Sequence, residues 1–179
     1  MFNIKLDVYH IAMYNVEYRI RVGEMAPDFT LKSTTGREIR LYDCKNKKSV
    51  LLFFFNHEKP ECLERLKTLA EDYEKFKEAG AAIFPISILG ADEGRAIVER
   101  LGLPFGILCD DDHSVVRSYN MGKCSSTPAH VCFEVIQGVE RPTMLVVDTS
   151  GIIRYIQRVD ASGNPDNLTL LEECRKAIE

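Results

Sequence analysis

The pattern of apolar and polar positions predicts alternating strands and helices through the middle of the chain. Residues 49–55 form an almost unbroken apolar run, which is typical of a strand buried on both faces of a sheet. From about residue 60 to 79 the apolar residues recur at helical spacing, with Pro60 suited to the first helical position and Gly80 to the stop. Further elements are predicted as a strand at 81–87, a helix at 92–101 and a short strand at 105–108. This alternation implies right-handed crossovers between parallel strands.

The flanking segments predict antiparallel pairs. Residues 29–32 and 38–41 read as a short hairpin, and residues 144–147 and 152–157 as a second one around a Ser-Gly turn. The remaining elements are expected as a short helix at 113–119, a long loop at 120–140 and a closing helix at 167–178. Loops of that length in a compact domain are often functional.

We therefore predict an α/β fold with a mixed central sheet and helices on both of its faces. Residues 2–22 contain two stretches that alternate apolar and polar residues, each typical of a half-buried strand. The expected division is an N-terminal β extension over residues 1–21 and one domain over residues 22–179, a size that allows a sizeable core.

Composition and charge narrow the function classes. The net charge is −4, which gives no electrostatic case for binding nucleic acid. No segment approaches the roughly 20 apolar residues of a membrane span. Because the first residues alternate apolar and polar, they do not resemble a secretory signal, and we expect a cytoplasmic protein.

Cys62 is the candidate for reactive chemistry. It lies between the apolar run and the predicted helix, which places its thiol on the first turn of a helix that follows a buried strand. Unsatisfied backbone N–H groups and the helix dipole both favour a thiolate at such a helix end. The thiolate is the reactive form of cysteine. The alternative is a small buried apolar residue, as most free cysteines are.

Five other cysteines accompany it, at Cys44, Cys109, Cys124, Cys132 and Cys174. Cytosolic thiols are usually reduced, so a structural disulfide framework is not expected in a chain of this length. Cys124, His130 and Cys132 lie close in sequence but match no paired Cys-x-x-Cys zinc pattern. We expect no metal and no organic cofactor.

Three segments carry a resemblance to a known family. Residues 22–31 resemble the opening G-x-x-A-P-D-F-x-L of the alkyl hydroperoxide reductase/thiol-specific antioxidant (AhpC/TSA) superfamily. Residues 102–110 resemble its Pro-Phe segment that ends in Asp, and residues 143–154 resemble its F-x-I-D-x-x-G-x-I-R hairpin. The resemblance covers about residues 22–160 and implies the peroxiredoxin variant of the thioredoxin-like fold.

The active-site motif departs from the family pattern. Peroxiredoxins carry Pro-x-x-x-Thr-x-x-Cys, and here the Thr position is Lys59 and the Pro position is Phe55. Thioredoxin-like relatives carry Cys-x-x-Cys, and here the first cysteine is also replaced by Lys59. The surviving Cys62 is the thiol that peroxidase chemistry needs, because a dithiol exchange would attack with the missing first cysteine. The Lys59 ammonium would favour the thiolate, or it is a solvated lysine.

Arg141 is the second departure. The family's active-site arginine stands six residues before the hairpin aspartate, where this chain has Pro142, and Arg141 stands one position earlier. A shift of one residue in a strand reverses the side-chain direction, so Arg141 points into the site or away from it. The Pro142-Thr143 pair resembles thioredoxin-like relatives in which a proline faces the reactive cysteine.

The resemblance implies a thiol peroxidase that reduces hydrogen peroxide or small organic hydroperoxides, with Cys62 as nucleophile and Lys59 and Arg141 as stabilising cations. A thioredoxin-like protein or a small thiol would be the reductant, and a homodimer is an open option. The resolving cysteine is left open among Cys124, Cys132, Cys174 or none. The alternatives are a non-catalytic redoxin domain for redox sensing or binding, and a monothiol disulfide reductase.

Overall fold

The computed structural model describes residues 20–124, 136–139, 142–160, 162 and 165–179, and the predicted N-terminal β extension lies almost entirely outside them. The strands are β1 (Thr30–Ser33), β2 (Glu38–Arg40), β3 (Ser49–Phe54), β4 (Ala81–Ser87), β5 (Leu108–Cys109), β6 (Gly122–Cys124), β7 (Ile136–Val139), β8 (Thr143–Val147) and β9 (Ile153–Arg158). The helices are the 3-10 helix η1 (Leu41–Cys44), then α2 (Pro60–Glu71), α3 (Tyr73–Glu78), α4 (Ala91–Leu101), α5 (Ser114–Ser118) and α6 (Asn167–Lys176).

Seven of these strands form one mixed sheet in the order β2-β1-β5-β4-β3-β8-β9. The β3–β4 and β4–β5 pairs are parallel, and the other pairs of this sheet are antiparallel. The predicted parallel centre and both predicted hairpins are therefore confirmed. All six residues of β3 are buried, as expected for a central strand covered on both faces.

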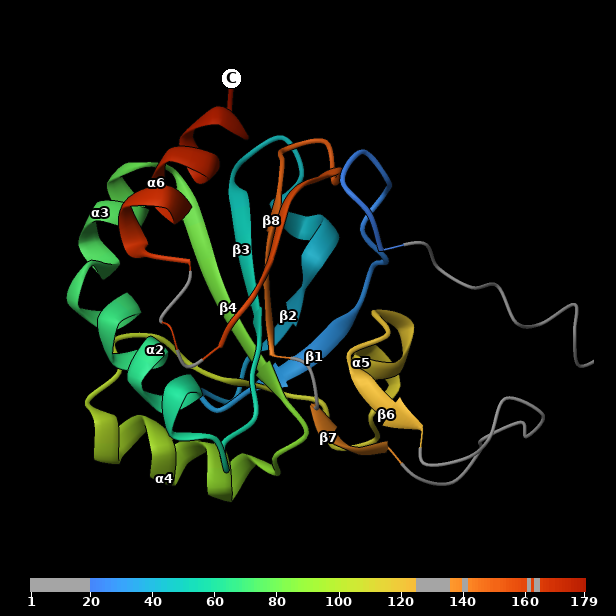
Figure 1. Cartoon of the computed structure of the whole chain (residues 1–179), viewed down its shortest axis with the longest axis vertical. Coiled ribbons are helices and arrows are strands. Elements are labelled where there is room, and N and C mark those ends of the chain that lie inside the picture. The colour runs from blue at the N-terminus through green and yellow to red at the C-terminus, as the bar shows by residue number, and fades with distance from the viewer. Residues whose placement is uncertain (1–19, 125–135, 140–141, 161, 163–164) are drawn as a thin grey trace, which may run out of the picture.

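Two apolar layers lie against the two faces of the sheet. Figure 1 shows α2, α3, α4 and α6 on one side and α5 with β6 and β7 on the other. Alternate residues of β3 serve the two layers: Leu51 and Phe53 pack with α2 and α6, whereas Leu52 and Phe54 pack with α5 and the segment around Phe29. The expectation of helices on both faces is confirmed.

Three sequence predictions need correction. The helix expected over 60–79 is broken at Asp72, whose carboxylate accepts hydrogen bonds from Asn167 (2.8 Å) and Lys75 (2.7 Å). The strand expected at 105–108 starts only at Leu108, because the N–H of Ile107 donates to the Thr34 hydroxyl instead of a neighbouring strand. The long loop expected at 120–140 contains the antiparallel pair β6–β7.

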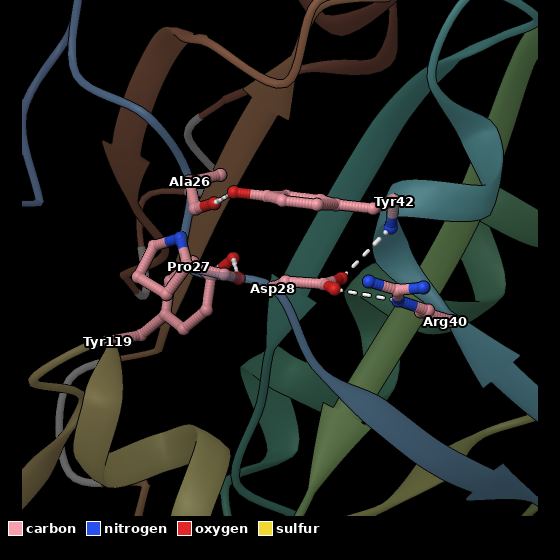
Figure 2. Close-up of polar contacts among 6 residues, drawn as sticks. All are labelled: Ala26, Pro27, Asp28, Arg40, Tyr42 and Tyr119. Carbon is pink, nitrogen blue, oxygen red and sulfur yellow. Dashed lines mark hydrogen bonds and ion pairs between the residues drawn. The ribbon is translucent and has the colours of Figure 1, made fainter.

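The opening segment, residues 22–31, forms a hydrogen-bonded clamp on the face of the sheet opposite α2. The Tyr42 and Tyr119 hydroxyls donate to the carbonyl oxygens of Ala26 (2.8 Å) and Pro27 (2.6 Å). The Asp28 carboxylate accepts hydrogen bonds from the Arg40 guanidinium and the Tyr42 N–H (Figure 2). This segment therefore ties the edge of the sheet to α5 and does not line the candidate site.

Candidate functional site

Cys62 is the third residue of α2, so the prediction of a thiol on the first helical turn is confirmed. Pro60 is the first residue of the helix, where its missing N–H costs no hydrogen bond and its fixed φ suits the helix. Lys59 precedes it with an extended backbone and accepts the Cys62 N–H at 3.0 Å through its carbonyl oxygen. The thiol is thus presented from the helix end that follows β3.

A tight turn connects β3 to this helix. The Asn56 side chain accepts the Glu58 N–H at 2.9 Å, and the Asn56 carbonyl accepts the Lys59 N–H at 3.1 Å. Both bonds are local, and the first is the side-chain-to-backbone turn that Asn favours. The backbone of Asn56 in this turn lowers the pKa of the Cys62 thiol.

The end of β4 holds the other side of this turn. The Phe55 N–H donates to the Ile86 carbonyl at 3.0 Å, and the Ser87 hydroxyl donates to the Phe55 carbonyl at the same distance. The sequence predicted Ser87 as part of a strand but gave it no role. The only sign of a role was a single hydroxyl at the end of an apolar strand. Its hydrogen-bond partner, Phe55, could not be predicted because it lies 32 residues away in the sequence.

Burial dominates the electrostatics of Cys62. Its side chain is 0% exposed and packs in the apolar layer between the sheet and α2. Burial raises the pKa of the thiol, and the Glu61 carboxylate acts in the same direction, whereas the Asn56 hydrogen bond and the Lys59 charge lower it. The net shift is upward. Burial therefore outweighs the hydrogen bond and the charge that lower the pKa, and the expected effect of the helix end on the thiolate stays a prediction.

Lys59 acts electrostatically in the expected direction. Its side chain is half-buried next to the helix end, and its charge lowers the pKa of Cys62. A role for Lys59 toward a substrate stays a prediction. Arg141 lies outside the described residues, so its predicted place near Cys62 also stays a prediction.

The start of β8 lies beside the site. Thr143 is paired with Phe54 at the end of β3. Met144 belongs to the same apolar layer as Cys62, whereas Leu145 belongs to the opposite layer. By this alternation, the buried Pro142 falls on the Cys62 side and Thr143 on the other. The Pro-Thr pair therefore matches the resemblance to relatives in which the proline faces the cysteine.

The three other cysteines whose side chains the structure describes are buried or half-buried. Cys174 is buried in α6, where burial raises its pKa to about 12. Cys109 is buried at the end of β5, and Cys44 is half-buried. The Cys124 side chain and Cys132 lie outside the description.

Within the described residues, no three His, Cys, Asp or Glu side chains gather closely enough to hold a metal ion. The helices that the structure describes include none that is both long and apolar enough to span a bilayer.

Comparisons with known proteins agree with this architecture. Residues 22–156 match the AhpC/TSA family. Peroxiredoxin Q, chloroplastic, of Triticum aestivum is 31% identical over 138 residues, which is 77% of this chain but 59% of the wheat protein. Peroxiredoxin Bcp of Bacillus subtilis is 28% identical over 140 residues, covering 78% of this chain and 87% of the relative. The chain thus spans less than two thirds of the length of the wheat and rice relatives that it matches.

Solved structures show the same fold. Peroxidoxin BcpB from Mycobacterium tuberculosis superposes with a TM-score of 0.75 at 18% identity, covering 90% of this chain and all of that one. Peroxiredoxin Q from Xanthomonas campestris gives a TM-score of 0.70 at 17% identity, with coverages of 84% and 92%. The predicted thioredoxin-like fold in its peroxiredoxin variant is therefore confirmed. From the match over residues 22–156, this chain belongs to the AhpC/TSA family.

Proposed function

We propose that this protein is a cysteine-dependent thiol peroxidase that reduces hydrogen peroxide or small organic hydroperoxides, with Cys62 as the nucleophile. The observation that carries the proposal is the position of Cys62 on the first turn of α2, directly after the central strand of a peroxiredoxin fold. The names of the relatives, peroxiredoxin Q and Bcp, support the same activity.

The chemistry needs one thiolate and one proton. The Cys62 thiolate attacks one oxygen of the peroxide, the O–O bond breaks, and the sulfur becomes a sulfenic acid. The departing oxygen leaves as hydroxide or alkoxide and takes up a proton to give water or an alcohol. Lys59 stabilises the thiolate and, in this proposal, Arg141 adds a second positive charge near the developing oxyanion.

An external thiol completes the cycle. The reductant's sulfur displaces water from the sulfenic acid to form a mixed disulfide. A second thiol of the reductant then attacks the reductant's sulfur in that bond, which releases the Cys62 thiolate and leaves the reductant oxidised to its own disulfide. Cys174 is a poor internal resolver because it is buried and its pKa is raised to about 12. A thioredoxin-like protein or a small thiol therefore fits best. Self-association into a homodimer stays a prediction.

A second function, redox sensing, is favoured by one observation. The Cys62 side chain is 0% exposed and its pKa is raised, mainly by burial, which slows attack on peroxide. A sensor would form the same sulfenic acid but turn over slowly. A monothiol disulfide reductase would instead accumulate a mixed disulfide and consume little peroxide.

The proposal is tested by identifying which cysteine of the protein hydrogen peroxide oxidises first. Reduced protein is treated with one equivalent of hydrogen peroxide, and sulfenic acids are trapped and located by mass spectrometry. The half-buried Cys44 serves as an internal control thiol, because burial also raises its pKa. The proposal predicts trapping at Cys62 ahead of Cys44, and its loss in Cys62→Ser. Equal or preferential oxidation of Cys44 would contradict it.

A further inference from the structure

We propose that Ser87 is a positioning residue for Cys62, acting through the peptide group that joins Phe55 to Asn56. The inference rests on the proposed role of Cys62 as nucleophile. It adds a residue that lies outside the family motif, on strand β4, to the residues that influence the Cys62 thiol.

The geometry begins with a buried hydroxyl. Ser87 is 1% exposed at the end of β4, a strand whose other residues are Ala, Ile, Phe and Pro. A hydroxyl in such surroundings is costly unless it is hydrogen-bonded. Its partner is the Phe55 carbonyl oxygen at 3.0 Å.

The same peptide group faces Cys62 with its other end. The carbonyl of Phe55 and the N–H of Asn56 belong to one planar unit, so a bond that fixes the carbonyl also fixes the direction of the N–H. The backbone of Asn56 lowers the pKa of the Cys62 thiol, as an N–H directed toward the sulfur does. The chain of donors therefore runs from the Ser87 hydroxyl, through one peptide plane, to the sulfur.

Two effects follow from this chain. Consecutive hydrogen bonds polarise one another, so the bond to the Phe55 carbonyl makes the Asn56 N–H a better donor to a thiolate. The bond also anchors the turn that sets the position of α2, because the Asn56 carbonyl accepts the Lys59 N–H and the Lys59 carbonyl accepts the Cys62 N–H. Ser87 therefore acts on both the orientation and the ionisation of the nucleophile.

Ser49 supplies a matched control. It is also a serine in a central strand and is 0% exposed, but it stands at the start of β3, at the far end from the turn. Its hydroxyl lies beside Cys174 in α6. Ser49→Ala removes the same atom from an equally buried place without touching the Phe55–Asn56 peptide.

The test measures the pH dependence of alkylation of Cys62 by iodoacetamide, with the modified peptide quantified by mass spectrometry. In Ser87→Ala the midpoint should move to higher pH, and at neutral pH the rate should fall by a factor of about two to five, since one hydrogen bond of a cooperative chain is lost. Ser49→Ala and the hydroxyl-retaining Ser87→Thr should keep the wild-type midpoint.

A purely structural role gives a different result. If Ser87→Ala only loosens the turn, Cys62 becomes more accessible, so the rate rises at every pH and the midpoint stays in place. An unmoved midpoint in folded Ser87→Ala, with folding checked by circular dichroism, overturns the inference. The readout needs no peroxide, so it is distinct from a failure of the peroxidase proposal, in which wild-type Cys62 reacts with peroxide no faster than Cys44.

Discussion

Cys62 and Cys174 belong to the same apolar layer but lie at opposite ends of β3. Cys62 follows the end of this strand through the turn at Asn56, whereas Cys174 lies beside Ser49 at its start. Five residue steps of strand separate the two ends by about 17 Å. A disulfide needs α-carbons within about 7 Å, so these two thiols cannot join without extensive unfolding.

Replacing Cys174 by serine should therefore leave peroxide reduction unchanged. The expected observation is the same rate of Cys62 oxidation and the same dependence on an added thiol as in the wild type. Peptide mapping of the oxidised wild type should contain no Cys62–Cys174 disulfide. Finding that disulfide in the folded protein would contradict the assignment of an external reductant.

The reaction of Cys62 should accelerate with pH beyond the range of an ordinary thiol. Burial raises the pKa of Cys62, so the protonated, unreactive form predominates at neutral pH. As pH rises through that raised value, the thiolate fraction and hence the rate should increase and then level off. The check is the second-order rate constant for peroxide between pH 6 and pH 10. A plateau already reached at pH 6 would show that the helix end and Lys59 outweigh burial.

Charges on either side of Cys62 should move its reactivity in opposite directions. Lys59 lowers the pKa of the thiol and Glu61 raises it. Lys59→Met should therefore slow the reaction at neutral pH about two- to fivefold, and Glu61→Gln should speed it by a similar factor, as expected for a charge near a partly screened site. Lys59→Arg keeps the charge and serves as the control. Slowing by both neutral substitutions would point to damage to the helix end instead of electrostatics.

The clamp around the opening segment should contribute to stability without affecting the thiol. Tyr119 is 0% exposed and its hydroxyl donates to the Pro27 carbonyl at 2.6 Å (Figure 2). Tyr119→Phe should lower the free energy of unfolding by about 1 kcal/mol, the usual net value of one hydrogen bond. Tyr42→Phe should lower the free energy of unfolding by less, because water can partly replace the half-buried hydrogen bond of the Tyr42 hydroxyl. Urea unfolding measures both, and an altered rate of Cys62 oxidation in Tyr119→Phe would contradict this separation.

Local signals in the sequence were sufficient for most elements. Pro60 and Gly80 predicted where the helical region begins and ends, and the phenylalanine-rich run predicted the central strand. The break at Asp72 could not be read locally, because its carboxylate is held by Asn167, 95 residues further along the chain. The β6–β7 pair escaped prediction because residues 125–135 separate its short strands in the sequence, which is longer than the two-residue loop that signals a hairpin.

In the candidate site too, local sequence signals predicted some features, whereas others depend on contacts between distant segments. The position of Cys62 followed from strand, proline and helix periodicity, which are local. Its raised pKa follows from burial beneath the surrounding core, and the role inferred for Ser87 follows from a contact between two neighbouring strands. Both depend on packing between segments that are distant in sequence, which no local pattern encodes.

The central claim, that Cys62 is the peroxidatic nucleophile, is tested most directly by stopped-flow oxidation of the reduced protein with hydrogen peroxide, with Cys62→Ser alongside. The account predicts a Cys62-dependent second-order rate constant at least a hundredfold above that of the same protein unfolded in urea at the same pH, since general positioning effects of this kind reach about that size or more. A rate equal to that of the unfolded chain would contradict it and leave redox sensing as the better function.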